Sequence, residues 1–197
     1  MKVKLIELTV ISITICLYSF GTYQRNIIWK DDLTLWQDVV KKSPYKSRSY
    51  VNLGIAYDRI GFPKKAIKEY QRAIRLNPYN YRAYLNLGAT YSDLALFPLA
   101  IKKYLKALAL APEDGEIYYN LGVAYQKLNL IDKAINSYKK AILFKPSNKD
   151  AYFNLALAYL KKGQKKEVIN CLNKVLELDP HDIEAERLMK NLSEGRI

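Results

Sequence analysis

A period of 34 residues runs through most of this chain and constrains its fold more than any other feature. Five prolines mark it, at positions 44, 78, 112, 146 and 180. The segments YVNLGIAY, YLNLGATY, YYNLGVAY and YFNLALAY keep the same step, at residues 50–57, 84–91, 118–125 and 152–159. The period divides the chain into four units, 47–80, 81–114, 115–148 and 149–182. Self-similarity at a period of roughly 20–50 residues indicates a stack of similar structural units.

Each unit has the pattern of two amphipathic helices joined by a turn. Apolar residues recur at steps of three and four, which places them on one helix face. Turn segments such as IGFPKK at residues 60–65 separate the halves, and each proline of the period ends or redirects the second helix. Aligned positions in the first unit are Tyr50, Leu53, Gly54, Tyr57, Ala66, Tyr70 and Ala73.

A 34-residue helix–turn–helix with these aligned positions resembles the tetratricopeptide repeat. The resemblance implies an all-α fold, a right-handed superhelix (α-solenoid) of four helix-turn-helix repeats. It also implies a concave groove lined by the first helix of each repeat. We expect a membrane-type helix over residues 1–23 and a juxtamembrane half-repeat over 24–46 before the repeats. A capping helix over 183–197 would follow them.

An asparagine occupies the sixth position of every unit, as Asn52, Asn86, Asn120 and Asn154. At about 100° per residue, this position lies opposite the Tyr, Leu and Gly packing face, so the amides are expected to form a row in the groove. A primary amide offers two donors and an acceptor, which suits a peptide main chain. The row resembles the asparagine ladder in the tetratricopeptide superhelix of O-linked N-acetylglucosamine transferase. That resemblance implies that the amides hold a peptide backbone; the alternative is that each one bonds within the scaffold.

The remaining groove positions would set specificity. The fifth position of the units is apolar, with Val51, Leu85, Tyr119 and Phe153. Charges are mixed, with Arg48 and Arg82 at one end and Glu116 and Asp150 at the other. This lining favours extended or helical segments with apolar side chains. Val51 and Ile55 stand where chaperone-binding members of the family have carboxylate contacts, so that activity is disfavoured.

Both flanks of the repeats resemble helices that cover the ends of the stack. Trp36, Val39 and Pro44 lie 34 residues before Tyr70, Ala73 and Pro78, so residues 31–44 have the pattern of a second half-unit. Either Asp31 or Asp32 would cap its helix. The residues expected to cover the first full unit are Leu35, Trp36, Val39 and Val40. After Asp182 as N-cap, the expected packing face of the last helix is Ile183, Ala185, Leu188, Met189 and Leu192.

The first 23 residues have the composition of a membrane segment. No charge occurs from Leu8 to Tyr23, and the 21 residues from Val3 to Tyr23 match the ~20 that a helix needs to cross a bilayer. Lys2 and Lys4 favour a cytoplasmic N-terminus, which predicts a single-pass protein with extracytoplasmic repeats. The alternative is a cleaved signal peptide, which would make the protein secreted or periplasmic.

The junction after this segment resembles the membrane-to-repeat segment of polytopic, tetratricopeptide-containing mannosyltransferase-like proteins. The residues that carry this resemblance are Arg25, Asn26, Trp29, Leu35, Trp36, Ser43 and Pro44. Those proteins place their repeats outside the cytoplasm and use carboxylates in early extracytoplasmic loops of a region with many membrane helices. This sequence contains no such region, so transferase activity does not carry over. An accessory part or a fragment of a membrane-embedded glycosyltransferase is the alternative function.

The sequence shows no catalytic or metal-binding constellation. It has one histidine, His181, and two cysteines, Cys16 and Cys171, which are expected to be free thiols. A net charge of +13 raises nucleic acid or an anionic surface as partners, but the clusters around Lys64 and Lys102 fall on the expected outer helices. We therefore expect a non-enzymatic, membrane-anchored scaffold that binds a protein or peptide segment in its groove. No cofactor, metal or nucleic acid is expected.

Overall fold

The computed structural model describes residues 31–196, and this part of the chain is helical with no strand. The first helix described is α2 (Asp32–Lys42). Four helix pairs follow: α3 (Ser47–Arg59) with α4 (Pro63–Leu76), α5 (Tyr81–Asp93) with α6 (Phe97–Leu110), α7 (Gly115–Lys127) with α8 (Ile131–Phe144), and α9 (Lys149–Lys161) with α10 (Lys165–Leu178). The last helix is α11 (Ile183–Ser193).

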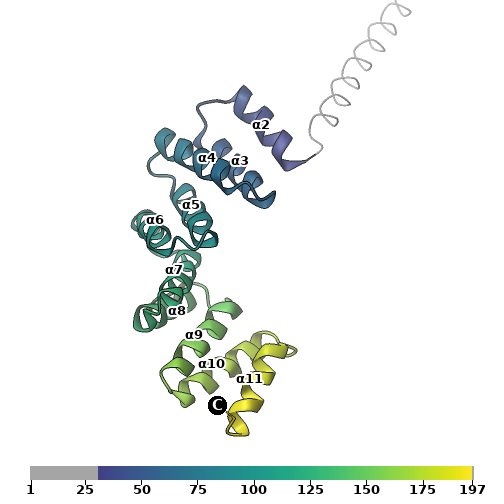
Figure 1. The fold of residues 1–197 in the computed structure, drawn as a ribbon, viewed down its shortest axis with the longest axis vertical. Coiled ribbons are helices and arrows are strands. Elements are labelled where there is room, and N and C mark those ends of the chain that lie inside the picture. Colours follow the sequence, from purple (N-terminus) through teal and green to yellow (C-terminus); the bar gives the residue numbers. More distant parts are fainter. Residues whose placement is uncertain (1–30, 197) are drawn as a thin grey trace, which may run out of the picture.

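The helix pairs stack in chain order. Each pair packs internally, and the second helix of one pair packs on the first helix of the next. Figure 1 shows the stack as an arc that runs from α2 at the top to α11 at the bottom, with α6 and α8 on its outer side. The predicted α-solenoid of tetratricopeptide repeats is therefore confirmed for this part of the chain. The predicted membrane-type segment, residues 1–23, lies outside the described residues.

A glycine in each of the first three pairs allows the second helix to bring a tyrosine ring against the first. A Cβ added at Gly54 would lie 2.5 Å from Tyr70 Cε1, and a Cβ at Gly88 would lie 2.5 Å from Tyr104 Cε1. Gly122 and Tyr138 repeat this arrangement at 2.4 Å. In the fourth pair both partners change together, to Ala156 and Leu172, and both are fully buried. The glycine is therefore required where the ring is present.

The same tyrosines place their hydroxyls beside a polar residue near the end of the first helix. Tyr70 donates to Asp58 Oδ2 at 2.8 Å, and Tyr138 donates to Gln126 Oε1 at 2.9 Å. Because a buried hydroxyl without a partner is costly, ring and acceptor are needed together. In the fourth pair, where Leu172 has no hydroxyl, the acceptor position is also apolar, Leu160.

Side-chain caps begin four of the helices at the positions that the repeat provides. Asp31 caps α2 by accepting from the Thr34 N–H at 2.8 Å, and Asp182 caps α11 by accepting from the Ala185 N–H at 2.9 Å. Asp114 and Asn148 cap α7 and α9 in the same way. Each cap satisfies an amide that has no partner within its own helix. Of the two predicted candidates for the cap of α2, Asp31 is therefore the one used.

The two flanking helices cover the ends of the stack. Val40 of α2 packs against the core cluster that contains Tyr50 and Tyr70, and Gln37 Nε2 donates to the Tyr57 hydroxyl at 3.2 Å. In α11, Ala185 is buried in the core cluster that contains Leu172 and Val175. Three partly buried residues of α11 pack against the same cluster: Leu188, Met189 and Leu192. The prediction for Ile183 was wrong. This side chain is 78% exposed, because the first residue of α11 lies beside Lys149 and Asp150 instead of over α10.

The described helices are all shorter and more polar than a membrane span. Among residues 31–196, no helix has the length and apolarity needed to cross a bilayer.

Candidate functional site

The four asparagines lie on the first helices of the four pairs, α3, α5, α7 and α9. All four side chains are half-buried, whereas the leucine that follows each of them is buried in the core. The pairs are Asn52 and Leu53, Asn86 and Leu87, Asn120 and Leu121, and Asn154 and Leu155. The helical period thus turns the leucine inward and leaves the amide on the opposite, accessible side.

Two of these amides line one cavity between α3 and α5. Its volume is about 360 Å³, and its lining residues are Arg48, Val51, Asn52, Ile55, Asn80, Arg82 and Asn86. Two guanidinium groups and three amides therefore converge on one space, where they offer many N–H donors and a few amide oxygens. This donor-rich lining suits the carbonyl groups of a peptide main chain or a carboxylate.

The cavity continues along the repeats toward α7. A neighbouring cavity of about 280 Å³ is lined by Ile55, Tyr81, Arg82, Leu85, Asn86, Asp114 and Glu116. Because Ile55, Arg82 and Asn86 line both spaces, the two form one groove across α3, α5 and α7. We call this lining the inner groove.

The amides of the row differ in what they bind within the protein. Asn86 Nδ2 donates to the Arg82 carbonyl oxygen of its own helix at 2.9 Å, and Asn154 Nδ2 donates to the Tyr119 hydroxyl at 3.2 Å. The Asn52 and Asn120 side chains make no hydrogen bond to another group in residues 31–196. Hydrogen bonds within the protein thus use some of the donors of the asparagine row, and the remaining donors and acceptors are available to a ligand.

The apolar positions form the floor of the groove to different degrees. Val51 is only 4% exposed and Leu85 only 7%, so both belong mainly to the core. Tyr119 and Phe153 are half-buried and offer more of their rings. Near α3 the accessible apolar surface comes from Ile55, a residue that lines three of the cavities.

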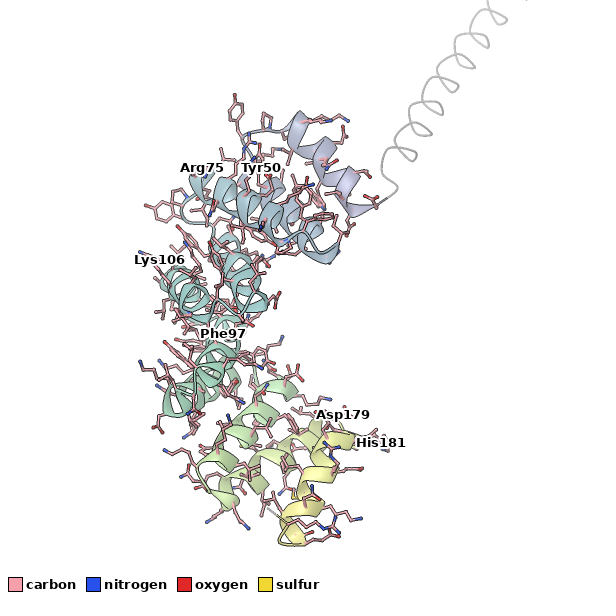
Figure 2. All side chains as sticks on the ribbon, in the orientation of Figure 1. Tyr50, Arg75, Phe97, Lys106, Asp179 and His181 are labelled. Atoms are coloured by element: carbon pink, nitrogen blue, oxygen red, sulfur yellow. The ribbon has the colours of Figure 1, made fainter. Side chains whose placement is uncertain are left out.

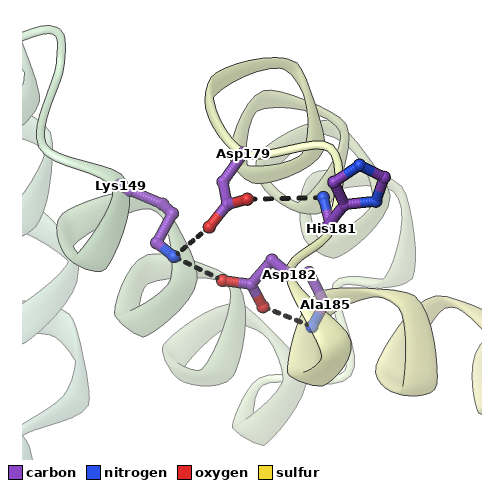
Figure 3. A network of polar contacts seen from close by, with 5 residues as sticks. All are labelled: Lys149, Asp179, His181, Asp182 and Ala185. Atoms are coloured by element: carbon purple, nitrogen blue, oxygen red, sulfur yellow. Dashed lines mark hydrogen bonds and ion pairs between the residues drawn. The ribbon is translucent and has the colours of Figure 1, made fainter.

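A second polar cluster joins α9 to α11 at the far end of the row (Figure 3). Lys149 Nζ lies 2.7 Å from Asp179 Oδ2 and 2.7 Å from Asp182 Oδ2. The ammonium group lowers the pKa of both carboxyls, mainly through these contacts, and the carboxylates raise the pKa of Lys149. His181 takes part through its backbone N–H, which donates to Asp179 Oδ1 at 3.3 Å. These ion pairs connect α9 to the start of α11, and a cavity of about 370 Å³ lies beside them.

Sequence reasoning missed two polar networks, one of which borders the groove through Asn80. Asn80 Nδ2 donates to Ser47 Oγ at 2.9 Å, and Ser47 Oγ donates to the Ala73 carbonyl at 2.8 Å. The signal for Asn80 was its place in the period, 34 residues before Asp114, at the junction between units. Asp58 accepts from both Tyr70 and Thr90 at 2.8 Å, and burial raises the pKa of its carboxyl.

The excess positive charge lies mainly on the second helices of the pairs. Basic residues outnumber acidic ones clearly on α4, α6 and α8, and among them Arg75 and Lys106 are exposed (Figure 2). The groove helices carry a more even balance of basic and acidic residues.

Cys171 on α10 is a free, buried thiol, and burial raises its pKa to about 11. Within residues 31–196, no three potential metal-ligating side chains cluster.

Comparisons with known proteins agree with this architecture. Family models described as TPR repeat match residues 64–94, 97–129 and 127–163, and one described as tetratricopeptide repeat matches 150–182. A solved structure titled "Crystal structure of MamA" is 31% identical with a TM-score of 0.68, and the match covers 76% of this chain and 87% of that chain. The structure "MamA 41-end from Desulfovibrio magneticus RS-1" has a TM-score of 0.70 at 22% identity, covering 83% and 94%, and it supports the fold alone.

A comparison with curated proteins found no match. The family models cover more than half of the chain, and one solved relative is above 30% identity over most of its own length. The chain belongs to the tetratricopeptide repeat family.

Proposed function

We propose that this protein is a non-enzymatic scaffold that binds an extended segment of a partner protein in the inner groove. Proteins built from tetratricopeptide repeats bind protein partners, and the groove supplies the chemistry for it. The amides of Asn52 and Asn86 hold the main chain of the partner. Ile55 contacts its apolar side chains within the groove, and the half-buried rings of Tyr119 and Phe153 offer further apolar surface beyond it.

The observation that carries this proposal is the convergence of the amides of Asn52, Asn80 and Asn86 on one cavity of about 360 Å³. An extended peptide presents a carbonyl and an N–H at every residue, so amides in a row can bond to it without reading its sequence. The Asn52 amide has no hydrogen-bond partner among residues 31–196, so its capacity is available to a ligand. The Asn86 side chain uses one N–H within its helix and keeps a second N–H and its oxygen.

We further propose that residues 1–23 anchor the protein in a membrane with the repeats outside the cytoplasm. The support is the uncharged run from Leu8 to Tyr23 and the lysines that precede it. A cleaved signal peptide is the competing outcome for the same segment. The accessory role beside a membrane glycosyltransferase stays a prediction, since its support is the resemblance of the junction at residues 24–46.

The groove proposal is tested by removing amides and measuring peptide binding. A random peptide library displayed on phage is selected against the full chain, and the affinity of the selected peptides is measured by fluorescence anisotropy. For Asn52→Ala/Asn86→Ala we expect affinity to fall about 30-fold, since two lost hydrogen bonds are worth about 2 kcal/mol. Helical content by circular dichroism stays the same, because alanine favours helices more than asparagine does.

A matched control removes two asparagines outside the groove. Asn136 on α8 and Asn170 on α10 are exposed on second helices, so Asn136→Ala/Asn170→Ala should leave the affinity unchanged. Equal affinity of the wild type and the groove variant would reject the role of the amides. Equal losses in both variants would also reject it.

A further inference from the structure

A charged residue occupies the second position of every unit, one helical turn before the asparagine. The series also includes α11, and its members are Arg48, Arg82, Glu116, Asp150 and Glu184. All five side chains are exposed. Two cations are thus followed by three anions along the direction of the stack. We call this series the charged row.

The first three members of the charged row line the same cavities as Asn52 and Asn86, and the last two line a separate cavity at the far end of the stack. Arg48 and Arg82 line the cavity between α3 and α5, and Arg82 and Glu116 line its continuation toward α7. Asp150 and Glu184 line the cavity at the far end, together with Phe153. A ligand that extends from the groove to the far cavity would therefore meet positive charge near α3 and α5 and negative charge from α7 to α11.

The charges of the row are not used up within the protein. None of its five members takes part in an ion pair in residues 31–196. Lys149, which stands next to Asp150, is instead held by Asp179 and Asp182. Arg82 Nε donates to the Tyr81 hydroxyl at 3.4 Å, a neutral partner, so the row remains available to a charged ligand.

Helix electrostatics explain the three anions but not the two cations. Each member lies in the first turn of its helix, where the partial positive charge of the N-terminus favours a carboxylate. Glu116, Asp150 and Glu184 agree with this preference. Arg48 and Arg82 oppose it, because each places a cation at a positive helix end. The arginines therefore weaken their own helices slightly, which favours a role in binding.

We infer that the protein binds an extended peptide segment with separated charges, with its acidic end in the inner groove at Arg48 and Arg82 and its basic end beyond the groove, toward Asp150 and Glu184 at the far cavity. This inference rests on the proposed groove function and adds the charge pattern and placement of the ligand. Packed helices lie about 8–10 Å apart, and an extended chain advances about 3.3 Å per residue, so roughly three ligand residues correspond to one step of the row. The five members thus span roughly a dozen ligand residues, and the charge of the ligand changes sign over the single step from Arg82 to Glu116.

The test selects a random peptide library on phage against the full chain and two variants. Arg48→Glu/Arg82→Glu reverses the cationic end of the row. Lys102→Glu/Lys106→Glu changes the net charge equally on the exposed outer face of α6 and serves as control. We expect peptides selected on the wild type and on the control to carry acidic residues in one half and basic residues in the other. Peptides selected on the groove variant should lose the acidic half.

A direct measurement compares one selected peptide with a shuffled peptide of identical composition. We expect the peptide with separated charges to bind about tenfold more tightly at low salt, with a smaller ratio at high salt. Selected peptides that depend on Asn52 and Asn86 but show no separation of charge would overturn this inference and leave the groove function standing. If no peptide depends on those asparagines, both are overturned.

Discussion

The contact between Gly88 and the Tyr104 ring makes a sharp prediction about the packing of each helix pair. In Gly88→Ala the new Cβ would lie 2.5 Å from Cε1 and 2.6 Å from Cδ1 of Tyr104. The ring cannot move aside easily, because Tyr104 is only 1% exposed. The substitution must therefore push α5 and α6 apart or force the ring from its preferred conformation.

Two effects of opposite sign decide how much Gly88→Ala changes the free energy of unfolding. Alanine in a helix interior is favoured over glycine by about 1 kcal/mol. Overpacking of a well-packed core costs about 1–3 kcal/mol. Since the contact distance is well below the ordinary range, we take the upper part of this cost and expect Gly88→Ala to lose about 1–2 kcal/mol in the free energy of unfolding.

The fourth helix pair shows how the loss should be repaired. It combines Ala156 with Leu172, so Gly88→Ala/Tyr104→Leu reproduces a pairing that this protein already uses. Urea unfolding followed by circular dichroism for the wild type, both single variants and the double variant gives a coupling energy, which we expect to be favourable by about 1–3 kcal/mol. As control, Ala156→Gly relieves no clash and should lose about 1 kcal/mol.

The reasoning about the ring is refuted if Gly88→Ala is as stable as the wild type. It is equally refuted if the losses of the two single substitutions simply add in the double variant, since independent sites show no coupling.

Two further predictions concern pH. Burial raises the pKa of Asp58, so the folded protein favours the protonated carboxyl. The protonated carboxyl therefore contributes to the stability of the fold below the ordinary pKa of 3.8. This contribution to stability is lost as the pH rises through the raised pKa. Urea unfolding should therefore show the stability of Asp58→Asn, relative to the wild type, increasing between about pH 4 and pH 7; a constant difference would contradict this. Lys149 lowers the pKa of Asp179 and Asp182. Its ion pairs therefore stabilise the fold above the ordinary carboxyl pKa of 3.8, and this stabilisation is lost as the pH falls through the lowered values. Lys149→Met should be less stable than the wild type near pH 7 and equally stable near pH 2, and a deficit that persists in acid would exclude the ion pairs as its cause.

Much of the fold follows from local pattern. Helix faces repeat every three or four residues, and the 34-residue period repeats those faces in register. For this reason the sequence predicts that Leu87 points inward and that Asn86 points away from the core. It also predicts the cap at Asp182 and a cap at either Asp31 or Asp32, because a capping side chain acts on amides only two or three residues further on.

The use of each groove residue depends on contacts between helices. The sequence treats Val51 and Ile55 alike as apolar groove positions, yet α5 covers Val51 almost completely, and Ile55 keeps its accessible surface. The sequence also shows four equivalent amides, but Asn154 reaches Tyr119, a residue 35 positions away on another helix. Whether such groups meet depends on how closely two helices approach.

The sequence alone therefore determined the helices, their repeat and the side of each helix that enters the core, because these depend on neighbours within one or two turns. Only the tertiary structure decided which amides remain available, how Thr90 completes the network at Asp58, and that Lys149 pairs with Asp179. These contacts join residues about one repeat apart, and their distances depend on helix packing and side-chain conformation, which a periodic pattern does not specify.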